Sequence, residues 1–456
     1  MYKTTRQFRE LHHARSSRPV IDKYVVVPIL ACVYSSIIWP LSIVVSGSAS
    51  TLNGAVEGSL ENRIFWPIMA GISLALALQH RSRLGGYGLP PHIICLLAYL
   101  AFAGASVLWA FRPEIAFIRF VQEVMIITSI ILPAMLAART ADLMLGVFLC
   151  FALASILNAL FILGGSGQEV ILNLGKKVSI GYTGYFTTKN LLGECAAIAL
   201  LLAVHEFLHH GLRRMLGIII AVIATWILFL SSSKTALGLA LLVPLLARFT
   251  LIARKITGVS PAIILGTIPI FFFVLSNVSN FNMGRISYML YGDSTFTGRT
   301  TIWDFARIEI ERRPLLGWGY KSFWFVGPDG PSVEAPGWVK MMPNSHNGYY
   351  DMMLELGYVG LVFLVIFLVA TIHATGRVAD RDPARARLLL SLVLFVVLYN
   401  FLESLWLRAF DTPWVVFLVV VAEIGRHWQP LHPKDRTRAG DVAQPTRSRI
   451  RSISAR

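Results

Sequence analysis

Long unbroken runs of apolar residues constrain this chain more than any other feature of its sequence. The runs 24–46, 115–138 and 348–374 each exceed the roughly 20 residues that a helix needs to cross a hydrocarbon core of about 30 Å. Backbone groups inside lipid must pair within the protein, so we expect these runs to be helices. The expected fold class is all-α, a polytopic membrane protein with about 12 transmembrane helices, predicted at 24–46, 64–80, 90–111, 115–138, 143–164, 190–208, 215–231, 234–252, 261–279, 348–374, 386–403 and 412–428.

The balance of charges excludes a soluble enzyme and predicts an orientation in the membrane. Only 14% of the residues are charged, against roughly 25% in soluble domains. The formal net charge of +16 is better explained by the positive-inside rule than by nucleic acid, so no nucleic-acid partner is expected. A cytoplasmic N-terminus places most basic clusters inside, and an even number of spans returns the C-terminus to that side. These clusters include Arg81 with Arg83, Arg213 with Arg214, Arg254 with Lys255, and Arg385 with Arg387.

Polar segments interrupt and flank the predicted helices. Residues 1–23 form a basic cytoplasmic arm and residues 429–456 a basic cytoplasmic tail, and both are expected to be disordered. One large periplasmic loop, 280–347, lies between spans 9 and 10, and a shorter external segment covers 165–189. Connections of this length usually carry function.

The large loop contains predicted structure of its own. Residues 301–313 are expected to form a helix that Pro314 ends, while 327–343 is rich in Gly and Pro and is predicted to be irregular. Ser345 or Asn347 is a plausible N-cap for the next span. The predicted helix has an apolar face that we expect to lie on the membrane, formed by Ile302, Phe305, Ala306 and Ile310.

Three residues predicted on the outer side could carry chemistry. His346 stands at the mouth of a span, and an imidazole, which ordinarily titrates near pH 6.5, suits a general base. Arg299 follows a glycine and offers a planar fork for phosphate. Lys234 opens the eighth span after three serines. Each also has a plain alternative: a surface histidine, an ordinary loop arginine and a lysine at the membrane boundary.

Further polar residues surround these three in the predicted topology. Lys189 and Asn190 open the sixth span, Arg285 lies in the long loop, and Asn347 follows His346, so all are candidates for substrate binding. Other polar residues within or near the spans are interpreted as structural pairs between helices, namely Glu194, Arg119 with Glu123, and Asn400 with Glu403.

Helix direction gives these cations a common location. Even-numbered spans run from outside to inside, so their N-termini face outward with unpaired N–H groups. If spans 6, 8 and 10 are neighbours, cations and helix N-termini would ring one pocket that favours phosphate or pyrophosphate. No Cys/His cluster and no D-x-D pattern was found to indicate a metal, so neither a metal nor a cofactor is expected. The cysteines are interpreted as apolar packing residues: Cys32, Cys95, Cys150 and Cys195.

An ordered set of short motifs resembles a known family. Ser231-Ser232-Ser233-Lys234-Thr235 is followed by Gly298-Arg299-x-x-Ile302-Trp303, by Pro314-Leu315-Leu316-Gly317-Trp318-Gly319, and by Ser345-His346-Asn347 leading to Leu354-Glu355-Leu356-Gly357-x-x-Gly360. Between about 231 and 374 the chain resembles the O-antigen ligase and polysaccharide polymerase superfamily of bacterial envelope glycosyltransferases. The stretch 186–190 together with Lys234 is more similar to its exopolysaccharide polymerase branch.

This resemblance implies a function, a location and roles for particular residues. It implies an inverting, metal-independent polymerase that joins undecaprenyl-pyrophosphate-linked oligosaccharides at the periplasmic face of the bacterial inner membrane. His346 would match the family's base on the acceptor hydroxyl, and Arg299 and Lys234 its basic residues that hold the pyrophosphate. The family usually has Arg after the serines, so Lys234 departs from the pattern. The resemblance divides the membrane region into N-terminal helices, 24–230, and a ligase/polymerase-like region, 231–428.

Other functions remain open from the sequence. A ligase that transfers the glycan to another acceptor uses the same chemistry. A lipid-linked oligosaccharide transporter also fits the number of spans, although the charges gather at the outer rim and in one loop. A non-catalytic assembly partner is the last alternative. Expected partners are the lipid-linked oligosaccharide, a glycan acceptor, the lipid bilayer and, as candidates, polysaccharide assembly proteins.

Overall fold

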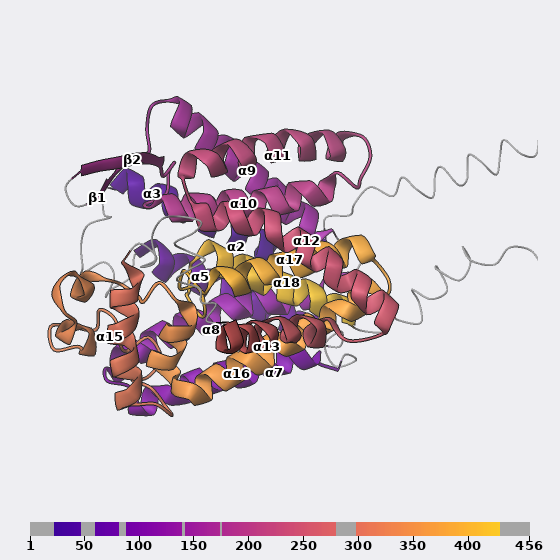
Figure 1. The fold of residues 1–456 in the computed structure, drawn as a ribbon. Helices are drawn as coiled ribbons and strands as arrows, with labels where there is room; N and C mark the ends of the chain where they lie inside the picture. The colour runs from indigo at the N-terminus through magenta and orange to yellow at the C-terminus, as the bar shows by residue number, and fades with distance from the viewer. Residues whose placement is uncertain are drawn as a thin grey trace, which may run out of the picture.

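The protein is a bundle of long helices with an elaborated loop region at one end (Figure 1). The computed structural model describes residues 22–46, 60–81, 88–138, 142–173, 176–279 and 298–428. Arg285 and the predicted terminal arms, apart from Asp22 and Lys23, lie outside these residues. The described elements are α2 (Lys23–Val33), η1 (Tyr34–Ile38), α3 (Trp39–Ser46), α5 (Leu60–Gln79), α7 (Pro91–Ala105), η3 (Ser106–Trp109), α8 (Pro113–Leu136), α9 (Leu143–Leu163), β1 (Gln168–Asn173), β2 (Lys176–Tyr182), α10 (Lys189–Glu206), α11 (Leu212–Ser231), α12 (Lys234–Thr257), α13 (Pro261–Ser279), α15 (Arg299–Arg312), η4 (Pro331–Glu334), η5 (Gly337–Met341), α16 (Gly348–Ala379), α17 (Pro383–Tyr399) and α18 (Thr412–Trp428).

Every predicted span coincides with a helix of the structure, although the helix ends differ by several residues. Among the described residues, seven helices are long and apolar enough to cross a membrane, so the chain is a multi-pass membrane protein. The total of about twelve spans remains a prediction. The seven are Lys23–Val45, Pro91–Trp109, Pro113–Leu136, Leu143–Leu163, Leu212–Ser231, Lys234–Thr257 and Gly348–Ala379.

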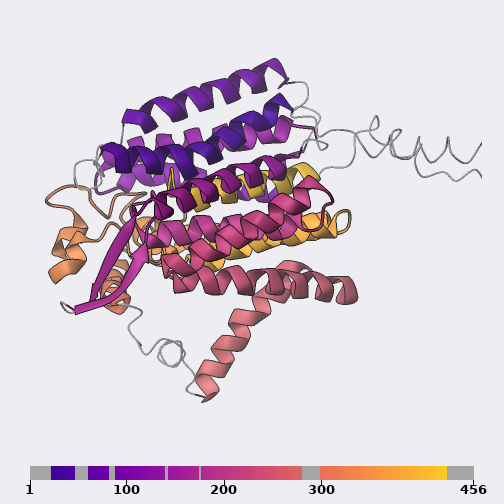
Figure 2. The same ribbon diagram turned by 90° about the horizontal axis from the view of Figure 1, so that it is seen from above.

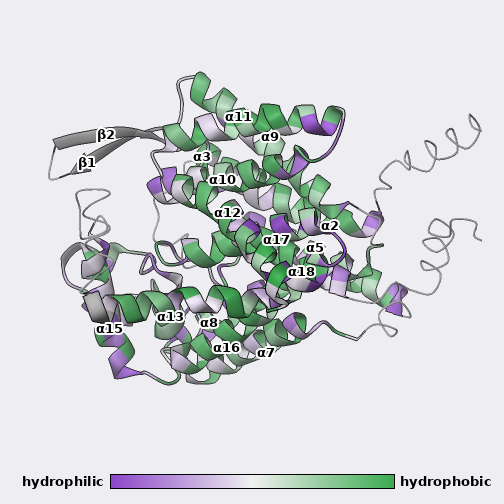
Figure 3. Cartoon of the chain, turned by 45° about the vertical axis from the view of Figure 1, so that its right-hand side comes forward, coloured by the Kyte–Doolittle hydropathy of each residue, from purple (hydrophilic) through white to green (hydrophobic). Residues whose placement is uncertain are grey.

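The interior of the bundle is built around α18. This helix packs against α8, α16 and α17, and more lightly against α2, α7 and α10. Its residues from Thr412 to Arg426 are buried, which explains why α18 is apolar on nearly every side. The outer helices instead expose large apolar side chains, as expected where lipid replaces water; Figure 3 shows hydrophobic residues along the helices. Examples are Val222, Phe229, Leu245, Phe249 and Phe271.

The segment 165–189, which the sequence predicts to be external, is partly a β-hairpin, and the all-α expectation missed it. Strands β1 and β2 pair antiparallel, with Gln168 opposite Tyr182 and Asn173 opposite Lys176. A bulge interrupts the register between Ile171 and Leu172. The strand residues include several β-branched side chains, which favour this conformation over a short helix. Figure 2 shows the hairpin projecting from the end of the bundle.

The amphipathic helix of the large loop is present as α15, but its apolar face does not lie on the membrane. That face is buried in a separate hydrophobic cluster formed mainly by the loop itself. Phe323, Trp324 and Val339 come from the stretch that follows α15, and Leu354 comes from α16. The expected membrane contact is therefore wrong, because aromatic residues within the same loop cover this face. The buried residues of α15 include Ile302, Phe305, Ala306 and Ile310.

A break in α16 docks the large loop onto the bundle. Gly357 has a φ of 64°, a conformation that favours glycine, and it interrupts the helix. The carbonyls freed at Leu354 and Glu355 accept hydrogen bonds from the N–H groups of Trp318 and Gly319, each at 2.8 Å. The N–H of Tyr358 in turn donates to the carbonyl of Pro314 at 2.8 Å. Two motifs noted in the sequence, 314–319 and 354–360, therefore complete each other's backbone hydrogen bonding.

Candidate active site

The carboxylate of Glu403 joins three of the predicted site residues, His346, Arg299 and Asn190. It follows the end of α17, where its N–H donates to the carbonyl of Tyr399. Its Oε2 lies 2.8 Å from His346 Nδ1. Its Oε1 lies 2.7 Å from Arg299 Nη2 and 2.7 Å from Asn190 Nδ2. Residues from α10, α15, the α16 N-terminus and the turn after α17 thus meet at one acid.

The contacts of Glu403 favour its charged form. Burial opposes ionisation, but the hydrogen bond from His346 and the charge of Arg299 outweigh it, so the pKa of this carboxyl lies below its usual value. An ionised carboxylate accepts hydrogen bonds only, so the ring nitrogen of His346 that faces it carries the proton. The Nε2 of a neutral His346 is then a free base, which can accept a proton from a hydroxyl group.

The backbone around His346 is fixed on both sides. His346 itself has a φ of 51°, which is uncommon for a residue with a side chain. Its N–H donates to Asn344 Oδ1 at 2.9 Å, and the N–H of Ser345 donates to Asp351 Oδ1 at 3.0 Å. The N–H of Gly348 is shared between the carbonyls of Asn400 and Glu403. The turn that carries His346 is thus hydrogen-bonded to the turn that carries Glu403.

Arg299 is anchored and still faces solvent in part. It is the first residue of α15 and follows Gly298, whose φ of 82° turns the chain into the helix. One guanidinium nitrogen donates to Glu403 and another to the carbonyl of Leu402. A guanidinium has five N–H groups, so it can also contact an anion while it keeps these two partners.

The remaining predicted residues that the structure describes lie at or near the same end of the bundle, in different settings. Lys234 is exposed at the start of α12, and Lys189 is half-buried at the start of α10. A side chain at Gly193 would come within 2.6 Å of the Ser233 Cβ, so this glycine lets the first turns of the two helices touch.

Asn347, another predicted substrate contact, is buried. Its side-chain oxygen caps α16 by accepting from the N–H groups of Tyr349 and Tyr350. This confirms Asn347 as the N-cap, and a substrate could reach that oxygen only in competition with the cap.

A cavity of about 650 Å³ opens two residues from His346, at Asn344. Its walls come mainly from α8, the stretch 320–325, the first turns of α16 and the segment 407–411 that precedes α18. The lining combines aromatic rings with side chains of both charges, a mixture suited to a polar ligand with apolar faces. The charged lining residues are Arg63, Arg119, Lys321, Asp351, Glu355, Arg408 and Asp411, and the aromatic ones are Tyr320, Trp324, Phe325 and Phe410.

Two comparisons place this arrangement among known proteins. A family model described as "O-Antigen ligase" matches residues 219–365. The chain is also 26% identical over 350 residues to the "Exopolysaccharide production protein ExoQ" of Rhizobium meliloti (strain 1021), which covers 72% of this chain and 74% of that protein. The resemblance to the O-antigen ligase and polysaccharide polymerase superfamily is thereby confirmed, in its ExoQ-like branch.

The matched family region holds part of the site. It includes Lys234, Arg299 and His346 and ends before Glu403. Glu403 was noted in the sequence only as a polar helix-end residue paired with Asn400. Its acidic side chain near the outer end of a predicted span was the one signal that could have drawn attention to it.

Proposed function

We propose that this protein is a membrane glycosyltransferase that polymerises undecaprenyl-pyrophosphate-linked oligosaccharide repeats into exopolysaccharide or O-antigen. The transfer takes place at the periplasmic face of the bacterial inner membrane, with both chain termini in the cytoplasm. The region 231–428, including the loop 280–347, carries the catalytic residues. The match to the O-antigen ligase family model and the similarity to a protein named for exopolysaccharide production support this proposal.

The observation that carries the proposal is the pairing of His346 with Glu403. Nε2 of His346 takes the proton from an acceptor hydroxyl, and the oxygen attacks the anomeric carbon of the donor sugar. The bond from that carbon to the pyrophosphate oxygen breaks, and its electron pair leaves with undecaprenyl pyrophosphate. A single displacement inverts the anomeric centre. Glu403 holds the imidazole tautomer and stabilises the imidazolium that forms.

The cations take the place of a metal at the leaving group. Arg299 and Lys234 would hold the pyrophosphate, while Lys189, Asn190 and Arg285 are proposed as further substrate contacts. The N-terminal turns of α10 and α12 meet at Gly193, so the positive ends of the two helix dipoles can add to the positive field. Neutralising a pyrophosphate makes it a good leaving group, so this reaction needs a base and cations more than it needs an acid.

A ligase of the same superfamily is the second candidate, favoured by the description of the matching family model. The chemistry at His346 is unchanged, and the acceptor is a sugar outside the polymer-forming pathway. In this case the cavity beside Asn344 would bind a different acceptor glycan.

A deletion strain separates the candidates by the size and carrier of its glycans. A polymerase predicts loss of long polymer and accumulation of single repeats on the lipid carrier. A ligase predicts intact polymer that stays on its lipid carrier. Unchanged glycans would overturn both and return attention to a transporter or an assembly partner. Re-expression of the wild-type chain and of His346→Ala in the same strain distinguishes loss of chemistry from loss of the protein.

A further inference from the structure

A second group of polar side chains lies at the far end of α10. From Asn190 in the first site to Glu206, the helix is about 24 Å long at about 1.5 Å per residue. His205 and Glu206 end α10, and His209 lies in the turn that follows, where its N–H donates to the carbonyl of Glu206 at 3.1 Å. The sequence interpretation overlooked this His205-Glu206-x-x-His209 pattern.

The three side chains converge. One ligand atom from each of His205, Glu206 and His209 lies within 4.8 Å of the others. The Nδ1 atoms of both histidines are buried and form no hydrogen bond within the described part of the chain. Buried ring nitrogens without a hydrogen bond are uncommon in proteins, and they are the atoms with which imidazole binds metals.

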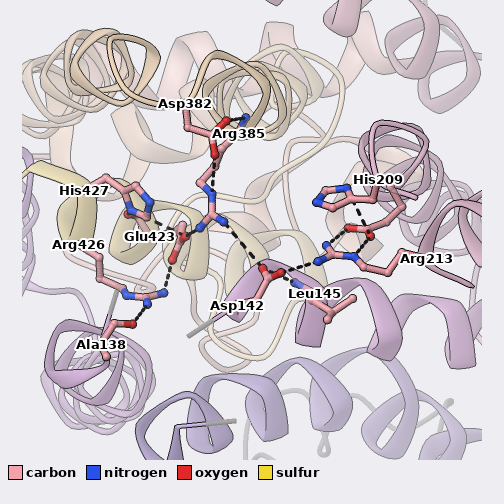
Figure 4. Close-up of polar contacts among 11 residues, drawn as sticks. Ala138, Asp142, Leu145, His209, Arg213, Asp382, Arg385, Glu423, Arg426 and His427 are labelled. Atoms are coloured by element: carbon pink, nitrogen blue, oxygen red, sulfur yellow. Dashed lines mark hydrogen bonds and ion pairs between the residues drawn. The ribbon is translucent and has the colours of Figure 1, made fainter. Parts of the chain in front are cut away.

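The charges around the cluster leave Glu206 able to act as a ligand. Its carboxylate accepts from Arg213 at 2.6 and 2.9 Å, and Arg213 also donates to Asp142 at 2.8 Å. Figure 4 shows Asp142 between Arg213 and Arg385. Asp142 thereby offsets the charge of Arg213. Each oxygen of Glu206 has two lone pairs, and metal-binding carboxylates commonly keep such a hydrogen-bonded partner.

We propose that His205, His209 and Glu206 form a binding site for a divalent transition metal, with Zn²⁺ the best match. Two imidazoles and one carboxylate suit Zn²⁺, whereas Mg²⁺ and Ca²⁺ prefer oxygen ligands throughout. A tetrahedral Zn²⁺ with nitrogen ligands at about 2.0–2.1 Å requires small side-chain rotations, and water completes its coordination. The bound ion clamps the end of α10 to the turn that leads into α11.

The same pattern on a helix is typical of zinc peptidases, in which the glutamate is the general base. Glu206 is the last residue of α10, and both of its oxygens are held by Arg213. In the proposed site Glu206 is itself a ligand of the ion and is not its general base, so the site binds metal without hydrolysing a substrate. The site lies about 24 Å along α10 from Asn190, so it is remote from the proposed site of sugar transfer.

The test is zinc binding to the purified full-length protein, with any polyhistidine tag removed. Calorimetric titration of Zn²⁺ is expected to find a site whose affinity falls at least about 10-fold in His205→Phe and in His209→Phe. Phenylalanine keeps the ring volume and removes the ligand nitrogen. The neighbouring His210 is exposed, so His210→Phe is the matched control and should bind as the wild type does.

A second measurement uses the wild-type protein and needs no variant to fold. Zn²⁺ should slow the modification of His205 and His209 by diethyl pyrocarbonate, mapped by mass spectrometry, without protecting His210. The proposal is overturned if neither histidine is protected, or if the ligand variants bind Zn²⁺ with the stoichiometry and affinity of the wild type.

Discussion

Two carboxylates at opposite ends of the bundle, Glu403 partly buried and Glu423 fully buried, have similar partners in different settings. Glu403 follows the end of α17 and contacts His346 and Arg299, whereas Glu423 lies on α18 and pairs with Arg385, near the start of α17, and with Arg426. The side chains of Glu423 and Arg426 are 0% and 1% exposed, and that of Arg385 is 19% exposed. Those of Arg299 and His346 are 17% and 28% exposed. The cluster around Glu423 is largely closed to solvent and joins helices. The cluster around Glu403 is partly exposed, so a substrate can replace some of its contacts.

Replacing the histidine of each cluster by alanine is expected to give the largest difference between the two clusters. His346→Ala should abolish polymer formation while the protein still reaches the membrane, because the acceptor hydroxyl loses its base. His427 lies near Glu423, and His427→Ala should leave polymer formation largely intact. Glycan size on gels, with protein quantified in membranes, measures both. Polymer of normal length from His346→Ala would show that this residue is not the base.

Replacing each glutamate by glutamine should lower mainly the transfer rate at Glu403 and mainly the stability of the protein at Glu423. Glu403→Gln is expected to lower turnover about 100-fold, because the imidazolium loses its counter-charge, with partial recovery in Glu403→Asp. Glu423→Gln removes the counter-charge of two arginines and should destabilise the protein by about 3–5 kcal/mol. Transfer rate and thermal unfolding of both purified variants are the measurements. Equal losses of stability in the two variants would contradict the distinction.

Replacing Arg299 and Arg426 by lysine is expected to give a smaller difference between the two clusters. Arg299→Lys should reduce transfer about 10-fold, since lysine keeps the charge but cannot contact Glu403 and a phosphate with one planar group. Arg426→Lys should lower thermal stability and leave the rate per folded molecule unchanged. Full activity in Arg299→Lys would assign Arg299 a purely structural role.

The smallest expected effect is that of a chelator on sugar transfer. Purified protein treated with EDTA should retain its rate, because in the proposed mechanism cations of the chain neutralise the pyrophosphate. The double variant His205→Phe/His209→Phe should behave in the same way, since the proposed zinc site is remote from His346. Loss of activity restored by a divalent ion in this variant would refute a metal-independent transfer.

Features set by local sequence were the ones that could be predicted. Apolar runs located the helices, Asn347 was one of two residues proposed as a cap, and the spacing of Ile302, Phe305, Ala306 and Ile310 identified the apolar face of α15. What this face packs against could not be predicted, because its partners Phe323, Trp324 and Val339 follow in a stretch without regular spacing.

The centre of the site depended on a contact between residues distant in the chain. His346 and Arg299 stand in recognisable motifs, but Glu403 is separated from His346 by 57 residues. A single acid at a helix end is usually a structural partner, and only the fold shows that it meets the histidine. The His205-Glu206-x-x-His209 pattern is short and visible in the sequence. It was overlooked because it lies where only a basic, cytoplasmic helix end was expected.

The break at Gly357 has a consequence for how the protein is assembled in the membrane. Helix α16 cannot satisfy its own backbone, and unpaired groups in lipid cost several kcal/mol each. Its partners, from Pro314 to Gly319, precede it in the chain and are translated first. They can therefore form these hydrogen bonds with α16 as it is inserted. A permuted chain that supplied 298–347 after α16 should stall at insertion or be degraded, even though its final contacts would be the same.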